Sequence, residues 1–320
     1  MPARYFTDDE VAELLTPAVV LESQRAAFTA LARGEAVLAP RVLVPGADDA
    51  VAFSYVARLT PESAAVSKLG SVNPANSARD LPLISATVHV LDAETGHPAA
   101  TIEGETLTTL RTAAASALAA QALAKPGART LGIIGAGVQA RAHALALADA
   151  LELDEIRIAG RSLDHAKDLA RELDEQLPVP VRSVVHEKAG ACDIVVTCTT
   201  SFEAVVETAW VRPGATVISV GAFAPDRQEL PASLVDRADR IVVDHRPTSA
   251  AQSGPVVTAI EAGSLAADDL VELGDVLIDE AGGRGGDDEI VLYFSVGVGI
   301  QDAAAAEALL RAAGPSDAAQ

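Results

Sequence analysis

An apolar run leads into a glycine-rich loop at Leu131-Gly132-Ile133-Ile134-Gly135-Ala136-Gly137-Val138-Gln139-Ala140. The loop has the spacing G-x-G-x-x-G/A at a predicted junction of strand and helix. There the first glycine permits a tight turn and the second lets the backbone approach a pyrophosphate. The start of the helix offers free N–H groups and a partial positive charge to the anion. A plain turn is the alternative, but the flanking elements favour a dinucleotide site with contacts at Gly135, Gly137, Val138 and Gln139.

Short apolar strands alternate with helices around and after this loop. We predict helices over Gln139–Ala150 and Leu163–Gln176, and strands over Thr130–Ile134, Glu155–Ala159, Asp193–Cys198, Thr216–Val220 and Arg240–Asp244. Continuous apolar strands that alternate with helices indicate a parallel sheet covered on both faces. The predicted fold class is therefore α/β, with a Rossmann-type doubly wound parallel sheet.

The residues before the loop follow a different pattern. A capping box at Thr7-Asp8-Asp9-Glu10 opens a predicted helix that runs to about Ala32. Short β-branched runs separated by turns then predict a mainly antiparallel sheet, which makes this part a smaller α+β domain. We predict that this domain comprises residues 1–113, that the dinucleotide-binding domain comprises 114–288, and that a C-terminal segment, 289–320, returns to the first domain.

Composition narrows the classes of partner. The chain has 320 residues, of which 49% are hydrophobic, and a formal net charge of −21. The electrostatic field of this negative charge repels the phosphates of nucleic acids and of anionic lipids, so neither is an expected partner. No uncharged apolar run approaches the length of a membrane span. Cys192 and Cys198 fit neither a disulfide framework nor a zinc site, so we expect no metal, and buried thiols in a reducing cytoplasm.

The end of the second predicted strand bears on the choice of cofactor. An acidic residue there usually binds the ribose 2′-hydroxyl of NAD. This sequence has Gly160-Arg161-Ser162 instead, and the next carboxylate is Asp164. Because Arg161 and Ser162 suit a 2′-phosphate, NADP(H) is the preferred cofactor, and NAD(H) stays open if the arginine is only an exposed loop residue.

A set of motifs follows in order along the chain: Lys68-Leu69-Gly70-Ser71-Val72-Asn73-Pro74-Ala75-Asn76, Asp92-Ala93-Glu94-Thr95-Gly96-His97-Pro98, Leu110-Arg111-Thr112-Ala113-Ala114-Ala115-Ser116, the loop at Gly135–Gln139, Phe294-Ser295-Val296-Gly297, and Gln301-Asp302. In this order and spacing they resemble the ornithine cyclodeaminase/μ-crystallin family over nearly the whole chain. The resemblance implies a homodimer, each subunit having a Rossmann domain and a substrate/dimerisation domain. It also implies a substrate with an amine or imine beside a carboxylate.

Three basic side chains correspond to substrate residues of the family. Arg41 matches an arginine that grips the substrate carboxylate, for which a planar guanidinium is well suited. Arg111, in the uncharged start of the predicted helix Leu107–Ala124, matches a residue between that carboxylate and the nicotinamide. Lys68 also stands out from the residues alone, because burial in an apolar strand lowers a lysine pKa toward neutrality. Each residue also has a purely structural alternative. Arg41 could be a surface residue at the start of a strand, Lys68 could lie on the outer face of an edge strand, and Arg111 could form a salt bridge on the surface of its helix.

Other positions match family contacts to the cofactor. Thr199 follows the predicted strand Asp193–Cys198, and Gly221 follows the next one. Ser295 and Gly297 match positions beside the nicotinamide. Ordinary loop and strand roles are the alternative for these residues.

One departure from the family pattern concerns the reaction itself. Cyclodeaminases of the family have an aspartate after a Val-Gly-Gly segment, and Phe223 occupies that position within Val220-Gly221-Ala222-Phe223-Ala224-Pro225-Asp226. Phenylalanine cannot exchange protons or hold an ammonium group, and Asp226 lies three residues later, across a proline. We therefore predict an NAD(P)H-dependent reductase of cyclic α-imino acids such as Δ1-pyrroline-2-carboxylate and Δ1-piperideine-2-carboxylate. The alternatives are an ornithine cyclodeaminase or amino-acid dehydrogenase, and an NADP-dependent small-ligand binding protein of the μ-crystallin type.

Overall fold

The computed structural model describes residues 3–79, 81–82 and 84–314. The chain divides into two compact units, which we call unit 1 (residues 1–111 and 299–320) and unit 2 (residues 112–298). The chain passes from unit 1 to unit 2 within helix α3 (Gly104–Leu123). Among the described residues, no helix is long and apolar enough to cross a membrane.

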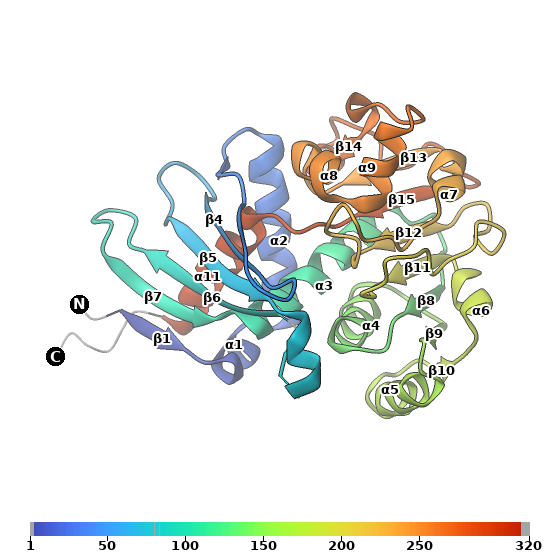
Figure 1. Ribbon diagram of the computed structural model, residues 1–320, viewed down its shortest axis with the longest axis horizontal. Helices are drawn as coiled ribbons and strands as arrows, with labels where there is room; N and C mark the ends of the chain where they lie inside the picture. Colours follow the sequence, from blue (N-terminus) through green and yellow to red (C-terminus); the bar gives the residue numbers. More distant parts are fainter. Residues whose placement is uncertain (1–2, 80, 83, 315–320) are drawn as a thin grey trace. The chain divides into compact units, whose positions relative to one another are not determined.

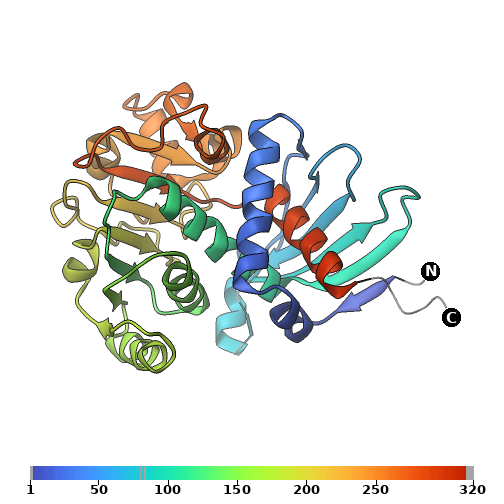
Figure 2. The same ribbon diagram turned by 180° about the vertical axis from the view of Figure 1, so that it is seen from behind.

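Unit 2 is built on one parallel sheet with the strand order β10-β9-β8-β11-β12-β15-β13-β14. Helices flank this sheet in Figures 1 and 2. The order runs outward in both directions from β8 and β11, which confirms the doubly wound α/β fold class. The strands are β8 (Thr130–Ile134), β9 (Glu155–Ala159), β10 (Val181–Ser183), β11 (Ile194–Thr197), β12 (Thr216–Ser219), β13 (Arg240–Val243), β14 (Val271–Glu272) and β15 (Val291–Phe294).

The helices of unit 2 follow its strands in the expected alternation. Helix α4 begins directly after the glycine-rich loop, and the helix after β9 has the predicted bounds. They are α4 (Val138–Ala150), α5 (Leu163–Gln176), α6 (His186–Gly190), α7 (Ala232–Arg237), α8 (Arg246–Gln252), α9 (Gly254–Glu261), the 3-10 turn η2 (Ala267–Asp269) and α10 (Leu273–Leu277).

Strand β15 corrects the predicted position of the C-terminal segment. We assigned residues 289–320 to the first domain, but Val291–Phe294 pairs in parallel with β12 and β13 in the sheet of unit 2. All residues of this strand are buried, as an apolar run at the centre of a covered parallel sheet requires. The chain re-enters unit 1 only at Gly299, where α11 (Gly299–Ala313) begins.

Unit 1 contains a mixed sheet with the strand order β1-β7-β6-β5-β4-β2, in which β3 also pairs with β4. Pairing is antiparallel except between β1 and β7. The strands are β1 (Arg4–Phe6), β2 (Val37–Leu38), β3 (Val42–Pro45), β4 (Val51–Arg58), β5 (Val66–Val72), β6 (Ile84–Leu91) and β7 (Pro98–Glu103), and a 3-10 helix, η1, spans Pro74–Arg79.

Two helices form where the sequence predicted one. Helix α1 (Asp8–Leu14) has the predicted capping box at Thr7 and Glu10. It ends before Thr16, which caps the separate helix α2 (Pro17–Ala32). The break follows from Pro17, which fits the first position of a helix but cannot donate a backbone hydrogen bond within one. Figure 2 shows α2 beside α11 against one face of the sheet.

Candidate active site

Lys68 is buried in unit 1 and meets a carboxylate there. It lies on β5 directly opposite Tyr55 of β4, so the two side chains project from the same face of the sheet. That face is covered by α11, which carries Asp302. The Lys68 Nζ donates to Asp302 Oδ1 at 2.9 Å and also to the hydroxyl of Thr108 on α3. Lys68 is only 2% exposed and Asp302 is 0% exposed, so this ion pair is removed from water.

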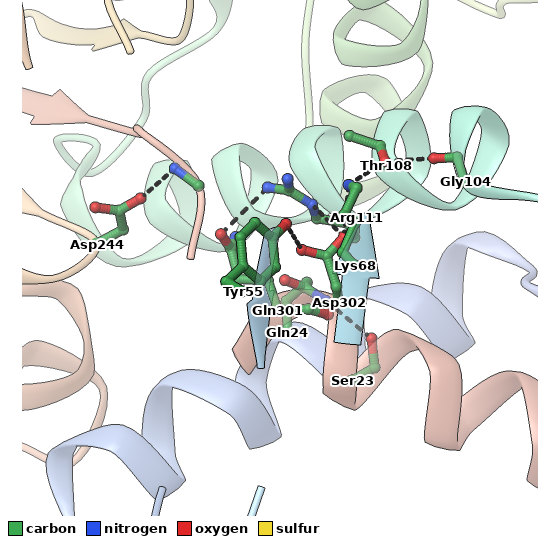
Figure 3. Close-up of polar contacts among 11 residues, drawn as sticks. Ser23, Gln24, Tyr55, Lys68, Gly104, Thr108, Arg111, Asp244, Gln301 and Asp302 are labelled. Carbon is green, nitrogen blue, oxygen red and sulfur yellow. Dashed lines mark hydrogen bonds and ion pairs between the residues drawn. The ribbon is translucent and has the colours of Figure 1, made fainter. Parts of the chain in front are cut away.

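Asp302 is the centre of a larger polar cluster, drawn in Figure 3. The Tyr55 hydroxyl donates to its other oxygen, Oδ2, at 2.5 Å. The Arg111 guanidinium lies 3.5 Å from Oδ1 and donates through Nη1 to Gln301 Oε1 at 3.2 Å. Gln24 of α2 donates to the Gln301 backbone carbonyl at 3.2 Å and ties this part of α11 to its neighbour. One carboxylate therefore orients a lysine and a tyrosine and lies beside an arginine.

The charges in this cluster set the protonation of Lys68. Burial lowers the pKa of Lys68 to about 8; Asp302 opposes the fall, while Arg111 and Arg41 add to it. Burial alone would raise the pKa of Asp302, but the charges of Arg111 and Lys68 outweigh burial and hold this pKa below its usual value. Burial and Asp302 raise the pKa of Tyr55 well above its usual value, so it stays a neutral phenol. Near neutrality the cluster holds more positive than negative charge, which suits a carboxylate ligand.

The three predicted substrate residues gather at this cluster. Arg41 lies between β2 and β3, and its guanidinium carbon is 5.8 Å from the centroid of the Tyr55 ring. Arg111 and Lys68 both approach Asp302, as described above. All three belong to unit 1, so one unit supplies two guanidinium groups and a buried amine at a single place.

Tyr55 and Asp302 were not predicted as site residues. Asp302 had a usable signal, because it interrupts the alanine-rich run Gly299–Ala313 much as Arg111 interrupts its own helix. Tyr55 gave none, because a tyrosine in an alternating strand reads as an ordinary core residue. Its role depends on the register between β4 and β5, which only the structure supplies.

The glycine-rich loop of unit 2 has the geometry of a pyrophosphate site. Gly135 has a φ of 138°, and a Cβ there would lie 2.6 Å from the backbone oxygen of Cys198. Gly137 caps α4, and a Cβ on it would meet nothing within 4 Å, so the approach to the helix start is open. Ala140 is fully buried against the sheet, as the motif requires. The loop therefore fits a dinucleotide, with the backbone N–H groups of Val138 and Gln139 in the first turn of α4.

Arg161 and Ser162 follow β9, next to this loop in the sheet. Ser162 caps α5 by accepting a hydrogen bond from the His165 backbone N–H at 3.3 Å. Arg161 is exposed, and within the described part of the chain it has no hydrogen bond or ion pair. Its guanidinium is thus available to a ligand at the end of the second strand.

The other predicted cofactor positions lie at the carboxyl ends of β11, β12 and β15. Thr199 and Gly221 both donate to the buried carboxylate of Glu229, which was not predicted as a site residue. The Gly297 backbone N–H donates to Asp244 Oδ2 at 2.7 Å, a contact visible in Figure 3. Burial raises the pKa of Asp244 despite this bond. The Ser295 hydroxyl is buried and has no partner among the residues that the structure describes.

Phe223 is partly buried and lies under a guanidinium instead of beside a carboxylate. The Arg227 guanidinium carbon is 4.8 Å from the Phe223 ring centroid and 5.4 Å from that of Phe202. Asp226, the acidic residue nearest in sequence, is exposed. At position 223, unit 2 therefore presents an aromatic ring in contact with a guanidinium.

Comparisons with known proteins identify the family and the relatives of the chain. The family model described as the ornithine cyclodeaminase/mu-crystallin family matches residues 5–313. The Delta(1)-pyrroline-2-carboxylate/Delta(1)-piperideine-2-carboxylate reductase of Azospirillum brasilense is 35% identical over 307 residues, which are 95% of this chain and 94% of that protein. The iminosuccinate reductase of Paracoccus denitrificans is 33% identical over 311 residues, 96% of this chain and 95% of that protein. The structure of Thermococcus litoralis Delta(1)-pyrroline-2-carboxylate reductase with NADH and L-proline superposes with a TM-score of 0.93 at 29% identity, and covers 97% of each chain.

Proposed function

The chain belongs to the ornithine cyclodeaminase/mu-crystallin family, and from that premise we propose that it is an NAD(P)H-dependent reductase of small cyclic α-imino acids. The substrates would be of the Δ1-pyrroline-2-carboxylate and Δ1-piperideine-2-carboxylate type, as in the Azospirillum relative. The observation that carries the proposal is the buried Lys68, with a pKa of about 8, which pairs with Asp302 and lies close enough to two arginines for their charges to lower its pKa. This cluster has the groups needed to bind a carboxylate and to protonate a nitrogen next to it.

Arg41 and Arg111 would hold the substrate carboxylate. Both lie close enough to Lys68 for their charges to lower its pKa. A guanidinium can bind both oxygens of a carboxylate at once, which fixes the orientation of the acid as well as its position. Because the imine carbon is bonded to that carboxylate, the same contacts would place the C=N group near the Lys68 amine.

Lys68 would supply the proton that the reduction consumes. Reduction of C=N adds a hydride to carbon and a proton to nitrogen, and the reduced nicotinamide supplies the hydride when bound. A lysine with a pKa of about 8 is largely protonated near neutrality and still acidic enough to transfer its proton. Asp302 would act as a positioning residue, because it orients the amine at 2.9 Å and keeps it charged against the effect of burial.

Phe223 favours net reduction over cyclodeamination. The Phe223 ring stacks against Arg227 and can neither exchange a proton nor hold an ammonium group. An apolar ring does suit the methylene groups of a cyclic imine. We therefore place ornithine cyclodeamination and amino-acid oxidation behind imine reduction.

We propose NADP(H) as the preferred form of the cofactor. Arg161 is exposed and close in sequence to the end of β9, and the nearest following carboxylate is Asp164. A guanidinium at this position would pair with a 2′-phosphate. The Thermococcus structure was solved with NADH, so the two forms need to be compared directly on this protein.

We also propose that the protein is a cytoplasmic homodimer. The face of the unit 1 sheet opposite Lys68 exposes large apolar side chains: Val42 is 59% exposed, Val56 45% and Leu69 54%. Contiguous exposed apolar residues on a sheet are typical of a protein interface. Both cysteines are free thiols, as is common in a reducing compartment.

The experiment that tests the proposed reaction follows the loss of NADPH absorbance with each cyclic imine in turn. We expect turnover with the five- or six-membered imine, and none with ornithine and NAD in the absence of a reductant. Iminosuccinate serves as an acyclic comparison, because a relative reduces it. Binding of NADPH without turnover of any imine would contradict the proposal and favour a ligand-binding role.

A further inference from the structure

Glu229 is a fully buried carboxylate that takes no part in the proposed chemistry. It accepts five hydrogen bonds from described residues at the ends of two neighbouring strands. Thr199 donates to Oε1 through its backbone N–H at 2.6 Å and its hydroxyl at 2.8 Å. Oε2 accepts from the hydroxyls of Thr197 and Ser219, both at 2.9 Å, and from the Gly221 N–H at 2.7 Å. No lysine or arginine in the described part of the chain forms an ion pair with it.

These bonds join the carboxyl end of β11 to that of β12. Thr197 and Thr199 belong to the first strand end, and Ser219 and Gly221 to the second. The two ends lie so close that a Cβ on Gly221 would be 2.0 Å from the Thr199 carbonyl oxygen and 2.6 Å from Glu229 Oε1. The carboxylate therefore joins the two strand ends just beyond their last backbone hydrogen bond, from the Val220 N–H to the Thr197 carbonyl at 2.9 Å.

The same hydrogen bonds occupy the donor groups of Thr199 and Gly221, which were both predicted to bind the cofactor. The N–H and hydroxyl of Thr199 and the N–H of Gly221 all point at Glu229, so they are not free to donate to a dinucleotide. Ligands of open parallel sheets lie outside the carboxyl ends of the strands, where these two residues are. Their remaining contribution is the position of their backbone, and Glu229 holds that backbone in place.

We infer that Glu229 is a positioning residue for the nicotinamide cofactor, acting through the Thr199 and Gly221 backbone. The inference rests on the proposed function, because it takes a nicotinamide dinucleotide as the ligand. Only a carboxylate satisfies all these donors, because its two oxygens are acceptors only. A glutamine in its place would turn its NH₂ group toward the backbone N–H of either Thr199 or Gly221, which can only donate, so one strand end would lose its partner.

The test compares cofactor binding by the full-length wild type, Glu229→Gln and Glu229→Asp. NADPH and NADH are titrated without substrate, and the dissociation constant is read from nucleotide fluorescence. Asp193→Asn is the matched control, because Asp193 lies directly before the amino end of β11, whereas Glu229 binds residues at its carboxyl end. Asp193 accepts from the Arg129 and Thr130 N–H groups, both at 3.1 Å, and pairs with Lys125 at 2.8 Å.

We expect Glu229→Gln to raise the dissociation constant of the nucleotide about tenfold or more, and Glu229→Asp by less, since about 1.4 kcal/mol corresponds to each tenfold. Asp193→Asn should lower the melting temperature but leave the dissociation constant within about twofold. At saturating NADPH, Glu229→Gln should keep most of its kcat, so the loss appears in KM for the nucleotide.

Three results would overturn the inference. The first is an unchanged dissociation constant in the Glu229 variants, and the second is an equal rise in Asp193→Asn. The third is a loss in kcat with no change in KM for NADPH. If Glu229→Gln does not fold, Glu229→Asp, which keeps the charge, decides the question. A wild type that binds neither nucleotide would instead contradict the proposed function.

Discussion

Replacing Asp302 by asparagine removes the charge that keeps Lys68 protonated. The bond between the Lys68 amine and Asp302 is 2.9 Å long and buried, and a charge-assisted hydrogen bond contributes about 1.5–3 kcal/mol. One pKa unit corresponds to about 1.4 kcal/mol, so we expect the pKa of Lys68 to fall from about 8 to between about 6 and 7. At pH 7.5 the protonated fraction of Lys68 would then fall from roughly three quarters to between roughly one quarter and roughly one thirtieth.

The assay is kcat/KM for imine reduction as a function of pH. As the proposed proton donor, Lys68 can act only below its pKa, so wild-type activity should decline as the pH rises through about 8. In Asp302→Asn this decline should begin about one to two pH units lower, with a loss of about threefold to 25-fold at pH 7.5 from protonation alone. The substrate imine titrates identically in both assays, so the difference between the profiles belongs to the protein.

A matched control lies on the same helix. Glu307 is a largely buried carboxyl of α11 that pairs with Arg311 at 3.6 Å, away from Lys68. Glu307→Gln should leave the pH at which activity declines unchanged. If Asp302→Asn loses activity equally at every pH, with the decline still near pH 8, then Asp302 does not set the protonation of Lys68 and the reasoning is wrong.

Three further changes test other parts of the structure. Arg161→Ala should raise KM for NADPH about tenfold or more and leave KM for NADH nearly unchanged; equal effects on both would remove the argument for NADP(H). Leu69→Lys, on the exposed apolar face of the sheet, should shift the protein from dimer to monomer in light scattering, and an unchanged mass would exclude this face as the interface. Gly135→Ala should abolish nucleotide binding, because the φ of 138° and the 2.6 Å approach to Cys198 leave no room for a methyl group. Wild-type binding by that variant would refute the assigned phosphate loop.

The sequence predicted many of the features that depend on neighbouring residues, although not the helix break at Pro17. Residues Leu131–Ala140 specify a strand, a tight turn and a helix start, because glycine spacing and apolar periodicity act locally. The alternation that follows was enough to predict a doubly wound parallel sheet. Lys68 could be singled out in the same way. A lysine within an apolar strand indicates a buried amine, even before the residue that pairs with it is known.

Only the tertiary structure decided which side chains meet. Tyr55 and Lys68 lie 247 and 234 positions before Asp302, so their hydrogen bonds depend on the register of β4 with β5 and on how α11 covers the sheet. The place of β15 in the sheet of unit 2 also follows from strand pairing and not from its own composition. Glu229 was not predicted as a site residue, because its donors come from two strand ends that are brought together only in the folded sheet. Local patterns therefore predicted many of the helices and strands and the basic residues of the candidate site. Long-range packing determined which carboxylates, Asp302 and Glu229, meet the groups that they hold in place.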